Sequence, residues 1–251
     1  MTRIASHRGG TLEFGDSTPH GFRQSALLAL EELEFDVHPT CDGAIMVHHD
    51  PTLDGTTDRS GAIVEMSEAE VRKAVINYSG GEHPLSLPEL CTIYGDSQVD
   101  FRCEIKPDGD GFAYPDFVPK VIETLRSQNM LQRTVFSSFL MASLDELAVA
   151  TERPRLWLVS PAVLRQLGQA ALIELCRSHE VPEIGVHVDS ADAALMAQVQ
   201  DAGLEFGVWA AHDASQLNKA FELGVKVLTC DRPSLAIELR RRFAADKQED
   251  E

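Results

Sequence analysis

The chain has 251 residues, which is long for one ordinary domain but normal for a single α/β barrel. Hydrophobic residues make up 43% and charged residues 25%, so the chain can bury a sizeable core and still stay in solution. The formal net charge of −18 repels other polyanions, so we expect no nucleic acid and no membrane as a partner.

The cysteines and the N-terminal residues point away from two further classes of protein. The five cysteines are odd in number and contain no CxxC pair, so we expect reduced thiols, not a zinc cluster or a disulfide framework. The residues before the first predicted strand hold no apolar signal core, and no later segment reaches transmembrane length. We therefore expect a cytoplasmic location.

The first part of the chain holds two predicted strands with a helix between them. The strands cover 3–6 and 33–37, and the helix covers 18–30. Asp42-Gly43 is a hairpin turn signal, so we expect the chain to pass the end of the second strand, turn, and return as far as His49.

A less regular segment comes next, and a regular alternation follows it. Residues 51–98 contain Gly, Pro and Ser clusters and one short helix near 67–76, which we interpret as an inserted segment over a barrel mouth. Further strands are predicted at 101–105, 134–137, 156–159, 184–188, 206–209 and 225–229. Helices are predicted at 115–128, 141–151, 161–179, 191–202, 213–223 and from Ser234 onward. Eight βα strands in all predict a single (β/α)8 TIM barrel domain over 1–251.

Polar residues gather at the ends of the early strands. In this fold the active site forms from groups at the carboxyl ends of strands, so these residues are candidates for chemistry. Each would be costly inside a strand unless it were paired or ligated. They are His7 and Arg8, Glu34 and Asp36, His49 and Asp50, and Glu104 and Lys106.

The acidic residues of this set predict a cation site. Glu34 and Asp36 are two apart, so both carboxylates point to one face of their strand, and Glu104 ends the next barrel strand. Three converging carboxylates repel each other unless a cation lies between them, and oxygen ligands suit Mg²⁺ or Ca²⁺ better than zinc. The alternative is that these acids form ordinary salt bridges with Arg8 and Lys106.

The basic residues predict acid–base chemistry on an anion. Two histidines, His7 and His49, can serve as general acid and general base near neutral pH. Arg8 and Lys106 supply the positive charge that a small anionic substrate needs. The planar guanidinium of an arginine can also donate two parallel hydrogen bonds to a phosphate. Either histidine alone is better explained as a hydrogen-bonded rim residue, but their convergence with the acids favours a catalytic site.

Three residues later in the chain are weaker candidates for the site. His187 and His212 each follow a predicted barrel strand, so they are secondary candidates. Asp231 ends the eighth strand, and we interpret it first as a helix cap and second as a rim contact.

At these positions the sequence resembles the glycerophosphodiester phosphodiesterase family. The resemblance runs from residue 3 to about 235, and its motifs are specific in combination although each is weak alone. The matching segments are His7-Arg8-Gly9, Glu34 to Val37, Thr40 to Gly43, Val47 to Leu53, Glu104-Ile105-Lys106, Phe206 to Trp209 and Val225 to Pro233.

The resemblance implies a reaction and a role for each matching residue. It implies hydrolysis of glycerophosphodiesters to glycerol 3-phosphate and an alcohol, in which a neighbouring substrate hydroxyl attacks the phosphorus and the cyclic intermediate is then hydrolysed. The divalent cation would be held by Glu34, Asp36 and Glu104, and His7 and His49 would be the acid–base pair. The substrate would be bound by Arg8, Lys106, Trp209 and Asp16.

The sequence also departs from the family pattern on the substrate side. Asp16-Ser17 stands where the family usually has Glu-Asn, Gly55 stands where an arginine often lies, and Ala210-Ala211-His212 replaces Thr-Val-Asn. These departures bear on the identity of the substrate more than on the reaction type.

Two alternatives stay open from the residues. One is the same barrel acting on a different phosphodiester, and the other is a ligand-binding barrel without catalysis. The second predicts damage to the catalytic set, which the sequence does not have. The alcohol moiety and the choice between a monomer and a homo-oligomer are not encoded in any motif.

Overall fold

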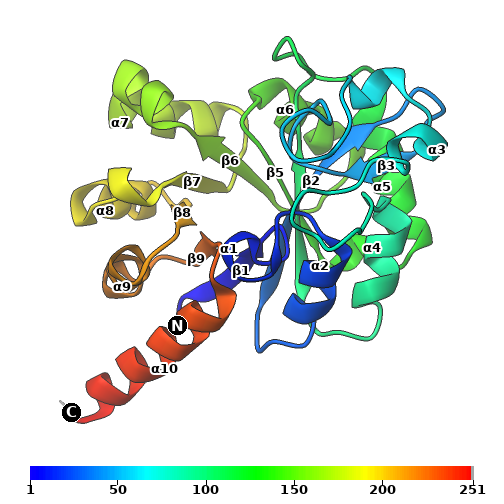
Figure 1. Cartoon of the computed structure of the whole chain (residues 1–251). Helices are drawn as coiled ribbons and strands as arrows, with labels where there is room; N and C mark the ends of the chain where they lie inside the picture. The colour runs from blue at the N-terminus through cyan, green and yellow to red at the C-terminus, as the bar shows by residue number, and fades with distance from the viewer. Residues whose placement is uncertain (250–251) are drawn as a thin grey trace.

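The computed structural model describes residues 1–249, and within them nine strands form one closed sheet (Figure 1). The order is β1-β9-β8-β7-β6-β5-β4-β2-β3, and β1 also pairs with β2. Only β3 is antiparallel to its neighbour among these strands, so eight parallel strands make a (β/α)8 TIM barrel, as predicted. The strands are β1 (Arg3–His7), β2 (Glu32–Pro39), β3 (Ile45–Val47), β4 (Asp100–Ile105), β5 (Thr134–Ser138), β6 (Arg155–Val159), β7 (Glu183–His187), β8 (Glu205–Ala211) and β9 (Val227–Cys230).

Helices cover the outside of the barrel (Figure 1). Several begin at a side chain that accepts a hydrogen bond from the first helical turn, as Asp192 and Asp213 do. The helices are α1 (Thr11–Phe14), α2 (Pro19–Ser25), α3 (Glu68–Val71), α4 (Leu87–Tyr94), α5 (Phe117–Ser127), α6 (Met141–Ala150), α7 (Pro161–Ser178), α8 (Ala193–Asp201), α9 (Ala214–Leu223) and α10 (Pro233–Glu249). Short 3₁₀ turns lie at η1 (Ile63–Glu65), η2 (Leu131–Arg133) and η3 (Val188–Ser190).

Alternation along the strands separates the core from the barrel interior. In β2 the apolar residues Leu33 and Phe35 face the helices and are fully buried, whereas Glu34 and Asp36 face inward. The ring of Phe35 packs edge-on against Phe101 of β4 at 4.9 Å between centroids. The apolar core therefore lies between sheet and helices, and the interior is left for polar groups.

The segment between β3 and β4 differs from the prediction in its helices. The helix expected near 67–76 is only the short α3, and the unpredicted α4 packs against the main core through Leu87, Leu90 and Tyr94. Its signal was present in the sequence, because Ser86 and Glu89 form a capping box ahead of that apolar stripe. Part of 51–98 is thus a helix of the barrel wall, while a separate small cluster contains Met46, Leu53, Ile63, Val71 and Ala74.

Two other helices differ in extent from the sequence-based expectation. The helix predicted over 18–30 ends at Ser25, and the helix predicted over 161–179 is interrupted at Gly168, whose φ is +74°. No helix within residues 1–249 is long and apolar enough to cross a lipid bilayer.

A buried ion network fills the amino-terminal end of the barrel. The Arg102 guanidinium contacts Glu32 at 2.7 Å and Glu183 at 3.1 Å, and all three residues are at most 3% exposed. Lys226 binds the other oxygen of Glu183 at 2.6 Å, and Arg3 binds Glu32 at 2.9 Å. Burial raises the pKa of Glu32, but the two arginines outweigh it and hold that pKa below its ordinary value.

We predict that Arg102→Met destabilises the fold by about 3–5 kcal/mol, because two buried carboxylates lose their shared cation. Urea unfolding followed by circular dichroism measures this loss. The control is Arg126→Ala, which breaks an exposed pair with Glu123 and should cost less than about 1 kcal/mol. Equal losses in both variants would contradict a structural role for the network.

Candidate functional site

The carboxyl ends of the barrel strands enclose a cavity of about 230 Å³. Of the site residues predicted from the sequence, seven line it, and the other two, Asp36 and Asp16, contact Arg8. The predicted lining residues are His7, Arg8, Glu34, His49, Glu104, Lys106 and Trp209. Two further lining residues had weaker support from the sequence: Ala210 as a departure on the substrate side, and His212 as a secondary candidate. Residues that the sequence did not indicate are Arg102, Ser137, Phe139, Leu158 and Thr229.

The three predicted acids form one buried cluster. Register pairs Asp36 of β2 directly with Glu104 of β4, and Glu34 lies one inward position below Asp36. One carboxylate oxygen from each lies within 4.8 Å of the others, which is a separation that a single divalent cation can span. Buried oxygens on all three residues take no hydrogen bond within the described part of the chain, so the donor set fits a hard cation.

Charge within the cluster is only partly balanced by protein groups. Lys106 lies 2.9 Å from Glu104 and 3.5 Å from Asp36, and Arg8 lies 3.0 Å from Asp36, though not along hydrogen-bonding directions. Burial and the neighbouring acids raise the pKa of Glu34 well above its usual range. Burial likewise raises the pKa of Glu104 to about 7. Near neutral pH the cluster therefore favours additional positive charge.

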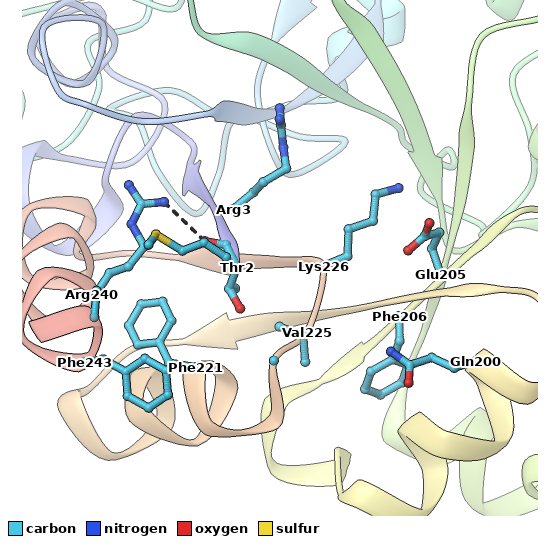
Figure 2. A pocket seen from close by; sticks show the side chains of 13 residues that line it. Thr2, Arg3, Gln200, Glu205, Phe206, Phe221, Val225, Lys226, Arg240 and Phe243 are labelled. Atoms are coloured by element: carbon cyan, nitrogen blue, oxygen red, sulfur yellow. Dashed lines mark hydrogen bonds between the residues drawn. The ribbon is translucent and has the colours of Figure 1, made fainter. Parts of the chain in front are cut away.

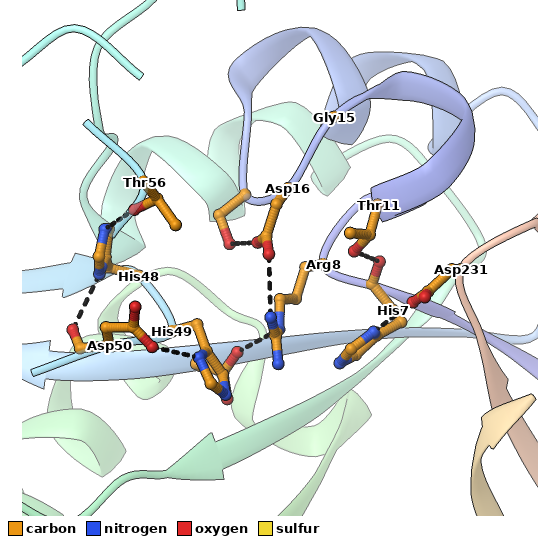
Figure 3. A network of polar contacts seen from close by, with 12 residues as sticks. His7, Arg8, Thr11, Gly15, Asp16, His48, His49, Asp50, Thr56 and Asp231 are labelled. Atoms are coloured by element: carbon orange, nitrogen blue, oxygen red, sulfur yellow. Dashed lines mark hydrogen bonds and ion pairs between the residues drawn. The ribbon is translucent and has the colours of Figure 1, made fainter. Parts of the chain in front are cut away.

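Arg8 and Lys106 are firmly held at the edge of this cluster. The Arg8 guanidinium also donates to Asp16 at 2.9 Å, and Ser17 donates to the other oxygen of Asp16 at 2.8 Å (Figure 3). Asp16 therefore orients Arg8 between itself and Asp36. Burial lowers the pKa values of Arg8 and Lys106, but the acids outweigh burial and raise both, so both stay charged.

Two histidines lie on either side of Arg8, each tied through Nδ1 to an aspartate (Figure 3). His7 Nδ1 is 2.5 Å from Asp231 Oδ1, and His49 Nδ1 is 2.6 Å from Asp50 Oδ1. An ionised aspartate accepts a hydrogen bond from Nδ1–H and leaves Nε2 to exchange a proton. His7 Nε2 lies 3.8 Å from Glu34, so this nitrogen is turned toward the carboxylates.

Asp231 is a rim contact, which corrects its first interpretation as a helix cap. Its two oxygens contact His7 and His212, and the first turn of α10 is instead capped by Glu13, which accepts from the backbone N–H groups of Ser234 and Leu235. The interpretation of Asp231 as a helix cap was wrong because the residue that caps α10, Glu13, is distant in sequence and reaches this helix only in the folded barrel.

The main chain of His49 is fixed by a second histidine. Burial lowers the pKa of His38 to about 4, so its ring is neutral, and its Nε2 donates to the His49 carbonyl at 3.0 Å. Its Nδ1 then accepts from the Tyr114 hydroxyl at 3.0 Å. This chain of contacts connects the hairpin strand to the loop after β4.

A larger cavity of about 490 Å³ lies at the opposite end of the barrel (Figure 2). Its cations Arg3, Lys226 and Arg240 are each paired with a carboxylate, and its floor contains Phe221 and Val225. Because these charges are already compensated and no acid–base pair adjoins them, the smaller cavity at the carboxyl ends is the candidate site.

Comparison with known proteins agrees with this assignment. The model of the glycerophosphoryl diester phosphodiesterase family matches residues 7–235. The chain belongs to this family. Its members are hydrolases, and the chain is an enzyme of that class.

Relatives of this family member cover nearly all of its length. A crystal structure from Agrobacterium tumefaciens, provisionally named a glycerophosphoryl diester phosphodiesterase, is 65% identical with a TM-score of 0.97 and covers 98% of this chain and 99% of its own. The glycerophosphodiester phosphodiesterase of Caldanaerobacter subterraneus is 25% identical over 96% of this chain and 98% of its own. A phosphodiesterase of Oleispira antarctica, solved with its product sn-glycerol-3-phosphate, shares the fold at 19% identity and a TM-score of 0.80, covering 96% of this chain and 97% of its own.

We predict that Mg²⁺ or Ca²⁺ stabilises this phosphodiesterase family member by about 2.7 kcal/mol at 100 times its Kd, and that Glu104→Gln removes most of that gain. Without added cation, Glu104→Gln should be at least as stable as the wild type, because the change relieves repulsion within the cluster. Thermal unfolding with and without EDTA measures both effects. Glu222→Gln, on the exposed face of α9, is the matched control, and an equal cation response in both variants would contradict the site.

Proposed function

We propose that the enzyme hydrolyses glycerophosphodiesters to glycerol 3-phosphate and an alcohol, with His7 and His49 as the acid–base pair. The observation that carries the proposal is that two His–Asp pairs and a cluster of three buried carboxylates adjoin one cavity. The product bound by the Oleispira antarctica phosphodiesterase is of the same chemical class and supports the choice of substrate.

Glu34, Asp36 and Glu104 would hold the divalent cation, for which we propose Mg²⁺ or Ca²⁺. When bound, such an ion supplies charge neutralisation at the phosphoryl group and lowers the pKa of a hydroxyl that it contacts. The unsatisfied buried oxygens of these three residues support this role.

The two histidines of the site would carry out the proton transfers. Burial lowers the pKa of His49, so its imidazole is neutral at pH 7 and takes a proton from the substrate hydroxyl that attacks the phosphorus. His7, held by Asp231 through Nδ1, delivers a proton from Nε2 to the alcohol oxygen as the phosphorus–oxygen bond breaks. In the second step water opens the cyclic phosphodiester and the two histidines exchange roles.

Arg8 and Lys106 bind the phosphate, and Trp209 bounds the site on the side away from the acids. Arg8 lies between Asp16 and Asp36, so a phosphate reaches a guanidinium whose direction is already set. Trp209 packs edge-on against Phe139 and His187, at 5.6 and 4.8 Å between ring centroids, and its indole N–H donates to the Gly185 carbonyl. This fixed ring limits the volume open to the glycerol or alcohol moiety.

We predict cation-dependent release of glycerol 3-phosphate from at least one of glycerophosphocholine, glycerophosphoethanolamine and glycerophosphoinositol. His7→Ala and His49→Ala should each lower kcat by roughly 10²–10⁴-fold, because each removes a proton-transfer group. His179→Ala, whose ring binds Asp145 far from the cavity, is the control and should keep wild-type activity. An enzyme-coupled assay for glycerol 3-phosphate gives the rates.

Two outcomes would contradict parts of this proposal. Absence of release from every diester, with and without cation, would overturn the activity. Equal release from an analogue that lacks the neighbouring glycerol hydroxyl would overturn the cyclic route but leave hydrolysis standing.

A further inference from the structure

Asp231 lies between two imidazoles. Its Oδ1 is 2.5 Å from His7 Nδ1, and its Oδ2 makes an ion-pair contact with His212 Nδ1. The carboxylate is only 5% exposed, whereas the His212 side chain is 43% exposed and lines the cavity. That His212 nitrogen takes no hydrogen bond within the described residues, so the ion pair with Asp231 is its polar contact.

A β-bulge in β8 brings His212 to this position. Val208 pairs with Leu228 and Ala211 pairs with Cys230, so two residues of β8, Trp209 and Ala210, stand opposite the single residue between those partners. Ala210 has a φ of +63°, which is an unusual backbone conformation for a residue with a side chain.

The bulge changes which side chains face inward. Strict alternation after Trp209 would turn His212 toward the helices. With the extra residue, Trp209, Ala210 and His212 all line the cavity, and Ala211 is fully buried in the core instead. The contact between His212 and Asp231 therefore depends on a local feature of the fold.

The backbone at His212 is also fixed. Its N–H donates to the Gln216 side-chain oxygen at 2.8 Å, and the Gln216 amide in turn donates to Asp189 at 3.1 Å. Asp213 caps α9 by accepting from the Gln216 N–H. The imidazole therefore approaches Asp231 from an anchored main chain, not from a free loop.

We propose that His212 is a positioning residue for the acid–base pair, acting on His7 through the shared Asp231 carboxylate. The inference rests on the proposed function, because it assigns a task to a residue of the same site. With both oxygens engaged, the carboxylate cannot rotate without losing one contact, so Oδ1 stays directed at His7 Nδ1. This keeps the proton of neutral His7 on Nδ1 and turns Nε2 toward Glu34.

The test compares two replacements of His212. His212→Asn places an amide nitrogen near the position of Nδ1, so a polar N–H group stays beside Asp231. His212→Leu fills a similar space without a donor. We expect His212→Leu to lower kcat by about 10–100-fold with little change in KM, and His212→Asn to restore most of that loss.

A double variant separates action through Asp231 from action elsewhere. Asp231→Asn should lower kcat by roughly 10²–10⁴-fold, because it disturbs the His7 tautomer. If His212 acts only through that carboxylate, the double variant with His212→Leu is no slower than Asp231→Asn alone. Additive losses, a change confined to KM, or an equal loss in His212→Asn would each overturn the proposal.

A measurement without turnover keeps this test independent of the proposed function and of folding yield. Long-range ¹⁵N–¹H spectra of histidine-labelled protein, recorded at alkaline pH so that the imidazoles are neutral, report which His7 nitrogen carries the proton. Wild type and His212→Asn should show the Nδ1–H form, and His212→Leu should show a mixture of tautomers. An unchanged His7 tautomer in folded His212→Leu would overturn the inference, even if no diester were hydrolysed by the wild type.

Discussion

The convergence of like charges where β2 and β4 run side by side is the constraint on which the site depends. Parallel register sets Asp36 against Glu104, and the two-residue period of β2 adds Glu34 to the same inward face. Such a cluster is stable only with positive charge around it, which explains why Arg8 and Lys106 fold onto it and why Asp16 holds Arg8 from behind. A bound cation would complete this balance and release the two basic side chains for a phosphate.

Buried carboxylates are paired differently at the two ends of the barrel. At the amino-terminal end, Glu32, Arg102 and Glu183 are paired with one another, and Lys226 and Arg3 satisfy the remaining oxygens. At the carboxyl end, carboxylate oxygens of the cluster take no hydrogen bond from residues 1–249, and His7 and His49 each bind an aspartate through Nδ1 alone. Buried carboxylates whose oxygens are all paired contribute to structure, whereas incompletely paired carboxylates can take a ligand or move a proton.

Most of the fold and much of the site were predictable because they depend on short-range periodicity. Alternating apolar strands and amphipathic helices indicated the barrel, and the carboxyl-end rule identified His7, Glu34, Asp36, His49 and Glu104 as neighbours. The helix α4 was not predicted, although the residues of its capping box are present in the sequence. The Gly, Pro and Ser residues around it suggested a loop instead. Phe139 and Leu158 were missed for a different reason, since apolar residues at strand ends look the same whether they face a cavity or a helix.

By itself, the sequence determined the alternation of strands and helices that indicates a barrel, and the shared face of Glu34 and Asp36, because each follows from the spacing of residues along one strand or helix. Only the tertiary structure decided that Asp231 joins His7 to His212, that Glu13 caps α10, and that a bulge in β8 turns His212 inward. These contacts join residues far apart in the chain or depend on one extra residue in a ladder. Neither leaves a periodic signal, because the partner's position is set by closure of the barrel.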